Sequence, residues 1–183
     1  MTKYYYDTGA FGYFLFLGNW EHKYSPTKVE AANMSVFCDE ELIYVYTKKG
    51  DFSDFGVKIT FLEIMERILS INALFKHDNV NLDDIRQKFI YMMGALIQNK
   101  VDLRKQFVDY KNGNHNTLKP LDGMDWLHLV VADLLGCNTI LTTDIGFKSL
   151  SNIWKYLKLD NVRKIIILSS NDKFEKIDEV ILE

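Results

Sequence analysis

Apolar positions along this chain follow two alternating periods. Short runs of β-branched and aromatic residues at 3–6, 139–143 and 162–169 are typical of buried strands. Residues 8–17 are apolar nearly all round a helix. A further helix begins after Asn81, its predicted N-cap, and its apolar residues recur on one face: Leu82, Ile85, Phe89, Met92 and Leu96. Strands thus alternate with helices at both ends of the chain.

The remaining segments extend this alternation. We predict helices at 26–38, 61–75, 122–135 and 147–157, strands at 42–47 and 57–60, and loops at 48–54 and 111–121, while 101–110 is ambiguous. Strands that alternate with helices require crossover connections, which produce a mostly parallel sheet with helices on both faces. We therefore expect residues 1–183 to form a single three-layer α/β/α domain with four or five strands.

Composition narrows the class of protein. The 183 residues are 48% hydrophobic, which is ordinary for a folded domain and argues against disorder. The longest apolar runs, such as 11–17, fall far short of the roughly 18 residues that cross a membrane. Asp7 interrupts any leader-like start, so we expect a cytoplasmic protein. Cys38 and Cys137 are too few for a disulfide framework and are expected to be buried, reduced thiols.

Charge is distributed unevenly along the chain. The formal net charge of −3 argues against generic coating of nucleic acid, which needs a basic domain. Residues 100–119 nevertheless hold five cations against Asp102 and Asp109: Lys100, Arg104, Lys105, Lys111 and Lys119. Two interpretations stay open for this stretch, a solvated surface or a region that binds a polyanionic substrate.

Acidic residues recur where predicted strands end or predicted helices begin. Asp7 follows the first strand, Glu63 follows the strand at 57–60, Asp144 follows the strand at 139–143, and Asp125 lies in the first turn of the helix that Asp122 caps. Each position is also explained by helix capping, and both Thr60 with Glu63 and Asp122 with Asp125 have capping-box spacing. Capping does not require these acids to converge.

Their position relative to the sheet does predict convergence. In an open parallel sheet, ligands bind beyond the carboxyl ends of the strands, at the topological switch. Carboxylates gathered there would repel one another, and a hard divalent cation with oxygen ligands relieves that repulsion. We therefore predict a Mg²⁺ or Mn²⁺ site held by Asp7, Glu63, Asp125 and Asp144, with Glu66 as the rival of Glu63 one turn away.

Together these segments resemble the PIN domain family of metal-dependent nucleases, which includes the VapC-like toxins. The resemblance rests on Asp7-Thr8 after the first strand, on Glu63, on Asp125 with His128, and on Thr142 with Asp144, in family order. It implies a single PIN-like domain that hydrolyses single-stranded RNA with metal-activated water. It also implies that Thr142 belongs to the catalytic site, with Thr8 in support. Many members carry a further acid where this chain has Gly146.

Other polar residues near these motifs have simpler interpretations. His128 is either a hydrogen-bonded core histidine or a group beside the site, one turn after Asp125. The run Asp39, Glu40 and Glu41 is expected to be solvated. Asp133, two turns beyond Asp125, is expected at the surface.

The resemblance implies three partners: an RNA substrate, an antitoxin protein and a second copy of the chain. The aromatic segment 11–24 either supplies the surface for such pairing or packs inside the domain. Two other functional classes compete with the ribonuclease. One is a PIN-like module that binds RNA or protein without cutting. The other is an ATPase of the sugar-kinase and actin type, indicated only by Asp7-Thr8-Gly9 and disfavoured because the further glycine-rich phosphate loops are absent from the sequence.

Overall fold

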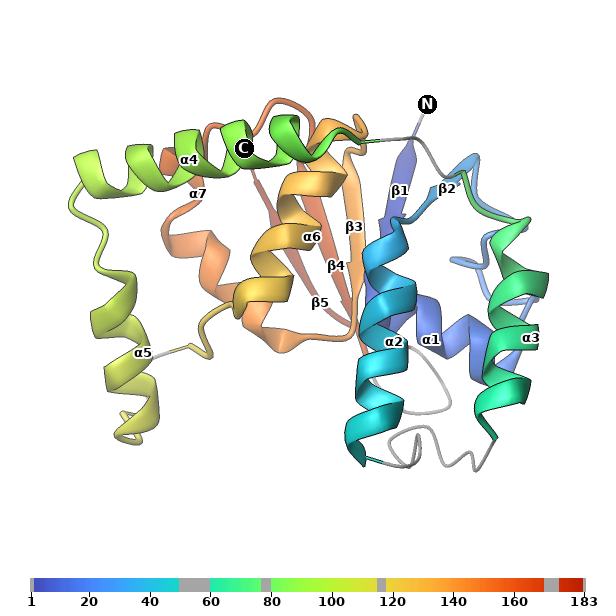
Figure 1. The fold of residues 1–183 in the computed structure, drawn as a ribbon. Helices are drawn as coiled ribbons and strands as arrows, with labels where there is room; N and C mark the ends of the chain where they lie inside the picture. Colours follow the sequence, from blue (N-terminus) through green and yellow to red (C-terminus); the bar gives the residue numbers. More distant parts are fainter. Residues whose placement is uncertain (1, 50–59, 77–79, 115–117, 170–174, 183) are drawn as a thin grey trace.

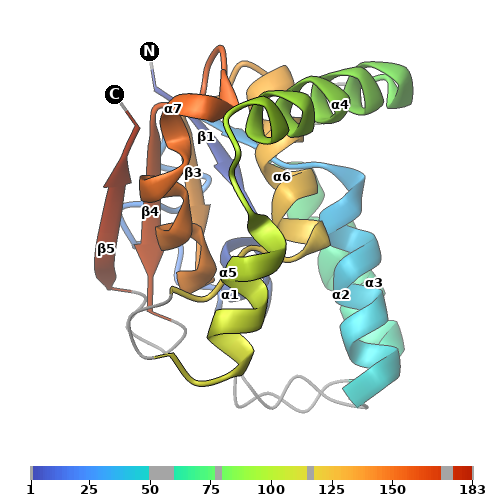
Figure 2. The ribbon, with the colours of Figure 1, turned by 90° about the vertical axis from the view of Figure 1, so that its left-hand side faces the viewer.

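A computed structural model describes the chain except for residues 1, 50–59, 77–79, 115–117, 170–174 and 183, and it contains one five-stranded sheet (Figure 1). The strand order is β2-β1-β3-β4-β5, formed by β1 (Lys3–Tyr6), β2 (Ala31–Asn33), β3 (Thr139–Thr142), β4 (Lys164–Leu168) and β5 (Lys176–Ile181). The first four strands are mutually parallel, and β5 pairs antiparallel with β4 at the outer edge (Figure 2). The expected mostly parallel sheet is confirmed.

Helices cover both faces of the sheet. The neighbouring residues Tyr5 and Tyr6 of β1 are both fully buried but belong to different cores, because successive side chains of a strand point to opposite faces. One core contains residues from α4 (Leu82–Gln98), α6 (Gly123–Leu134), η2 (Ile145–Asn152) and α7 (Trp154–Leu157). The other contains residues from α1 (Thr8–Leu17), α2 (Val36–Lys49) and α3 (Phe61–Asn72). This arrangement is compatible with a three-layer α/β/α fold.

The sequence predicted many of these elements but misassigned the region between α1 and α3. The predicted helix at 26–38 is wrong, because residues 31–33 form β2 beside β1 and α2 begins at Val36. The predicted strand at 42–47 is also wrong, since it lies within α2, where Cys38 and Leu42, four residues apart, are buried together. A short β-branched and aromatic run fits a strand or a buried helix equally well, and packing decides between them. The predicted strand at 57–60 lies largely outside the described residues.

Further expectations are settled by the packing of single segments. The ambiguous stretch 101–110 forms most of α5 (Leu103–Lys111), which has no buried residue and lies apart from the sheet (Figure 1). The first part of the aromatic segment 11–24 packs inside, because residues 11–16 are buried, whereas residues 18–21 are exposed. Both cysteines are buried thiols. Within the described part of the chain, no helix has the length and apolarity needed to cross a membrane.

Asp133 anchors α6 to the segment that leads into β4. Its carboxylate is 1% exposed and accepts the backbone N–H groups of Asp160, Asn161 and Val162 at 2.7–3.1 Å. The ammonium of Lys88 on α4 lies 2.7 Å from the same carboxylate. The expectation of a surface position is therefore wrong. Paired charge and three backbone donors compensate the cost of burying this acid.

Candidate functional site

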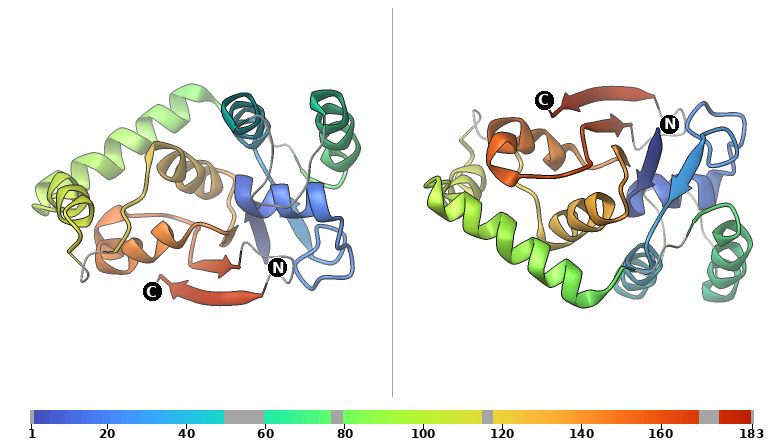
Figure 3. Two further views of the ribbon diagram at one scale, coloured as in Figure 1. Left: turned by 90° about the horizontal axis from the view of Figure 1, so that it is seen from below. Right: turned by 90° about the horizontal axis from the view of Figure 1, so that it is seen from above.

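The candidate site lies at the carboxyl ends of β1 and β3, the edge that faces the viewer in the left panel of Figure 3. The crossover through α1 carries the chain from β1 to β2 on one side, whereas β4 lies beyond β3 on the other. The strand order therefore reverses between β1 and β3, which is where open α/β sheets bind ligands. Asp7 and Thr142 lie at this point.

Asp7 is the residue that joins β1 to α1. Its N–H donates to the carbonyl of Leu141 at 3.1 Å, and its Oδ1 accepts the N–H of Ala10 at 2.9 Å as the N-cap of α1. The following turn passes so close to β3 that a Cβ at Gly9 would lie 2.0 Å from Thr143 Oγ1. Burial raises the pKa of Asp7 to about 6, although His128, Thr142 and Ala10 act in the opposite direction.

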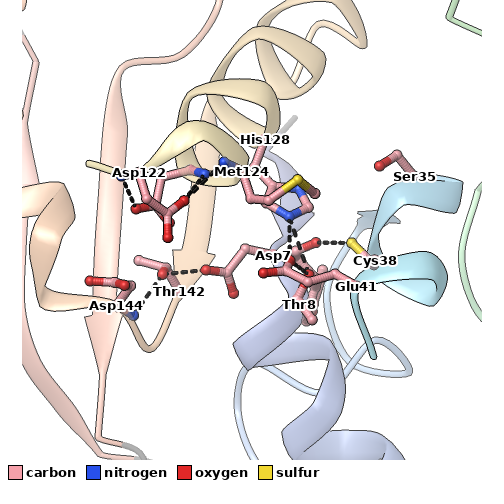
Figure 4. Close-up of polar contacts among 12 residues, drawn as sticks. Asp7, Thr8, Ser35, Cys38, Glu41, Asp122, Met124, His128, Thr142 and Asp144 are labelled. Atoms are coloured by element: carbon pink, nitrogen blue, oxygen red, sulfur yellow. Dashed lines mark hydrogen bonds and ion pairs between the residues drawn. The ribbon is translucent and has the colours of Figure 1, made fainter. Parts of the chain in front are cut away.

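Thr142 connects Asp7 with Asp144. Its buried hydroxyl donates to Asp7 Oδ2 and accepts the N–H of Asp144 at 2.9 Å (Figure 4). Asp144 in turn caps η2 through the N–H of Gly146. A Cβ at position 146 would lie 2.9 Å from Asp144 Oδ1, so this turn leaves no ordinary space for a side chain at 146. One hydroxyl thus holds together the two strand ends that the sequence predicted to converge.

Asp125 reaches the same region from the first turn of α6. It forms a reciprocal capping box with Asp122, in which Asp125 Oδ2 accepts the N–H of Asp122 at 2.9 Å. Burial raises the pKa of Asp125 to about 7, and the negative charges of Asp144, Asp122 and Asp7 add to that effect. Asp125 therefore caps its helix and also lies near the other acids, as Asp7 does.

Glu41 belongs to the neighbourhood of Asp7, contrary to the expectation that it lies in a solvated run. Its carboxylate accepts a hydrogen bond from Thr8 Oγ1 and lies 3.1 Å from Nε2 of His128. Tyr5 completes the surroundings of this buried ring, with its hydroxyl 2.7 Å from Nδ1. Figure 4 shows Thr8, Glu41 and His128 grouped beside Asp7. Reading residues 36–49 as a helix would have revealed Glu41, because it lies one turn from the buried Cys38.

The surroundings favour the charged forms of both Glu41 and His128. Burial disfavours the charged form of each group, but the hydrogen bonds from His128 and Thr8 outweigh it and lower the pKa of Glu41. Burial likewise acts to lower the pKa of His128, whereas Tyr5, Cys38 and Glu41 together raise it well above its usual value. Both interpretations offered for His128 apply, because it is a hydrogen-bonded core histidine that lies beside the site.

Glu63 is not brought to this cluster. Its exposed carboxylate accepts the N–H of Thr60 at 2.7 Å and the Thr60 hydroxyl at 2.8 Å, in a complete capping box at the start of α3. These bonds from Thr60 are the main reason that the pKa of Glu63 is lowered. Glu66 is exposed as well. For Glu63, the structure shows the capping interpretation rather than the convergent one.

A cation already contacts the acid cluster of Asp7, Asp125 and Asp144. Lys119, in the segment between α5 and α6, forms an ion pair with Asp144 Oδ2. Burial acts to lower the pKa of Lys119, but Asp144, Asp125 and Asp122 together raise it. Within the described ranges, no group of three or more acidic, histidine or cysteine side chains could hold a metal ion as they stand. As they stand, Asp144 is paired with Lys119, and Asp125 accepts the N–H of Asp122.

Comparisons with protein-family models, with curated proteins and with solved structures find no match to this chain. The functional assignment therefore depends on the residues themselves and on the resemblance in the sequence.

The buried acids predict how stability depends on pH in the absence of metal. Asp7 and Asp125 have folded pKa values of about 6 and about 7, above their ordinary 3.8, so the folded state binds more protons than the unfolded chain between those limits. His128 acts in the same direction. Its raised pKa contributes stability that is fully present below pH 6.5 and is lost as the pH rises. From the two acids, we expect the free energy of unfolding to rise by about 4 kcal/mol from pH 8 to pH 5.

Thermal melts at intervals of half a pH unit, with chelator present, would measure this dependence. The melting temperature should rise by roughly 8–16 °C toward pH 5. A flat or falling profile over this window would contradict the prediction. The Asp7→Asn variant is the control, because its profile should be shallower than that of the wild type.

Proposed function

We propose that this chain is a PIN-like, Mg²⁺- or Mn²⁺-dependent endoribonuclease that hydrolyses single-stranded RNA. The observation that carries the proposal is the meeting of Asp7, Asp125 and Asp144 at the topological switch, with Thr142 bonded to both strand-end acids. These acids come from three separate parts of the chain. Burial raises the pKa of both Asp7 and Asp125, and the charges of Asp144 and Asp7 add to the rise at Asp125. Perturbed acids in such a position are typical of a functional site rather than of caps alone.

The donor chemistry fits a hard divalent cation. Asp7, Asp125 and Asp144 offer carboxylate oxygens, and Glu41 adds a fourth acid whose charge is felt by Asp7. We assign Glu41 the part predicted for Glu63. When bound, the cation would supply a water of lowered pKa and would neutralise charge on the scissile phosphate. Loading would require Asp144 to leave Lys119, whereas Asp125 could keep its cap, because only Oδ2 accepts the Asp122 N–H.

The remaining residues of the site hold these acids in position. Thr142 fixes Asp7 by donating its proton and fixes the turn at Asp144 by accepting an N–H. His128, held by Tyr5, orients Glu41. Preorganised ligands of this kind reduce the reorganisation needed on binding, and removing such supporting contacts typically costs about 10–100-fold in metal affinity.

Substrate contact is assigned to the basic stretch 100–119. Its helix α5 is exposed and carries Phe107 and Tyr110 at 47% and 44% exposure, so aromatic faces accompany the cations. Stacking on such faces and phosphate contacts are how single strands are bound without sequence readout. The choice of RNA, and a toxin role with an antitoxin or a second copy as partner, come from the PIN resemblance. Within the early aromatic segment, residues 11–16 are buried and cannot serve in pairing, which leaves the exposed residues around Trp20 as its candidate surface.

Cleavage of a single-stranded RNA with Mn²⁺ or Mg²⁺, with and without chelator, tests the proposal. Asp144→Asn should lower the rate by at least about a hundredfold while keeping the fold, because asparagine caps a helix as well as aspartate but supplies no ligand charge. Glu63→Gln is the matched control, since Glu63 also belongs to a capping box, accepting the Thr60 N–H at 2.7 Å, and lies outside both the acid cluster and the basic stretch.

Three results would count against hydrolysis at this site. They are cleavage that survives chelator, cleavage undiminished in Asp144→Asn, and loss of cleavage in Glu63→Gln. RNA binding without any metal-dependent cleavage would instead indicate the non-catalytic module.

A further inference from the structure

Lys119 lies beside acids whose charge a bound metal ion would neutralise, so a metal-loaded site would not need this lysine. Its ammonium is paired with Asp144 and interacts electrostatically with Asp125 and Asp122. It enters from the segment between α5 and α6, whereas the acids come from β1, β3 and the start of α6. Its side chain is 37% exposed and that of Asp144 is 26% exposed, so neither end of the pair is locked inside the protein.

The ion pair offsets the repulsion that the cluster creates. The negative charge of Asp144 disfavours the ionised form of Asp125 and so raises its pKa. Lys119 supplies a positive charge at this position. A divalent cation and the lysine ammonium would therefore compete for the same carboxylate, Asp144.

We propose that Lys119 acts as an internal counter-cation of the acid cluster and sets the affinity of the site for divalent metal by competing for Asp144. The inference depends on the proposed function only in requiring that the cluster binds metal. With metal absent, Lys119 stabilises the folded protein. With metal bound, Asp144 is transferred from Lys119 to the metal and the ammonium is released.

Binding of Mn²⁺ alone, measured by calorimetry on the full chain without RNA, tests the inference. Lys119→Met removes the charge and keeps the length of the side chain, and it should bind Mn²⁺ about fivefold more tightly, the factor expected for a partly exposed ion pair. Without metal the same variant should melt at a lower temperature, so the shift produced by Mn²⁺ should grow. Lys119→Arg, which keeps the charge, should stay close to the wild type.

Lys105→Met provides the matched control. Lys105 belongs to the same basic stretch and is exposed, so its loss changes net charge equally without touching Asp144. If Lys105→Met tightens Mn²⁺ binding as much as Lys119→Met, a general charge effect replaces the inference. Lys119→Gln serves as a second neutral variant should Lys119→Met fold poorly.

The possible failures can be told apart. Equal or weaker Mn²⁺ binding by the neutral variants, with binding and RNA cleavage intact in the wild type, would overturn the role of Lys119 alone. Absence of Mn²⁺ binding in every variant, wild type included, would overturn the metal site and this inference with it.

Discussion

Replacing Asp7 with asparagine is expected to abolish RNA cleavage and, with chelator present, to raise the melting temperature. The loss of rate should reach at least about a thousandfold, because the variant removes a ligand charge from the centre of the site. Stability should increase because the folded protein disfavours the ionised form of Asp7, as its pKa of about 6 shows. A gain of about 1 kcal/mol corresponds to roughly 2–4 °C in a domain of this size.

The geometry indicates that the fold will tolerate this change. Asparagine Oδ1 can accept the Ala10 N–H as the aspartate does, and its amide can donate to the Thr142 hydroxyl, which now donates to Asp7. Cleavage assays and melts at pH 8, with and without Mn²⁺, would test both parts together. The prediction requires two changes in opposite directions: the rate of RNA cleavage falls, and the melting temperature without metal rises. A variant that loses activity because it is less stable would show that Asp7 is mainly a structural cap.

The largest effect on stability is expected at Asp133. Asp133→Ala should lower the free energy of unfolding by about 3 kcal/mol, because three backbone N–H groups and the Lys88 ammonium lose a buried acceptor. The melting temperature should fall by roughly 6–12 °C. Urea unfolding followed by circular dichroism would measure the loss.

Asp160 provides the matched control for this loss. Its carboxylate also pairs with Lys88, at 2.6 Å, but its side chain is 78% exposed. Asp160→Asn should therefore change the free energy of unfolding by no more than about 0.5 kcal/mol. Similar losses at the two positions would mean that the Lys88 pair, rather than the backbone contacts of Asp133, dominates.

Local sequence predicts those elements whose pattern and packing agree. The bounds predicted for 3–6 and 8–17 match β1 and α1. An aromatic strand followed at once by an N-cap aspartate determines both where the strand ends and where the helix begins. The helix predicted over residues 31–33 was wrong because alanine favours helices, whereas pairing with β1 decides the conformation of these residues. The strand β5 was not predicted, since charged residues such as Glu179 interrupt its apolar pattern, as is common at a sheet edge.

The same contrast applies to the site. Asp7, Thr142 and Asp144 were predictable because a strand end fixes where such residues lie. Glu41 was missed because its role depends on α2, which local pattern assigned to a strand, and on the packing of α2 near His128. Glu63 was predicted to join the other acids because a capping box and a metal ligand can have the same local sequence. Only the path of α3 distinguishes the two.

The bond between Thr142 and Asp7 spans 135 positions of the chain. During synthesis on the ribosome, the first acid emerges long before the hydroxyl that fixes it and before Asp144, which completes the cluster. A growing polypeptide therefore has no assembled cluster until β3 has paired with β1. If the protein degrades RNA, the messenger being translated is safe from that nascent chain until the codons for β3 have been read.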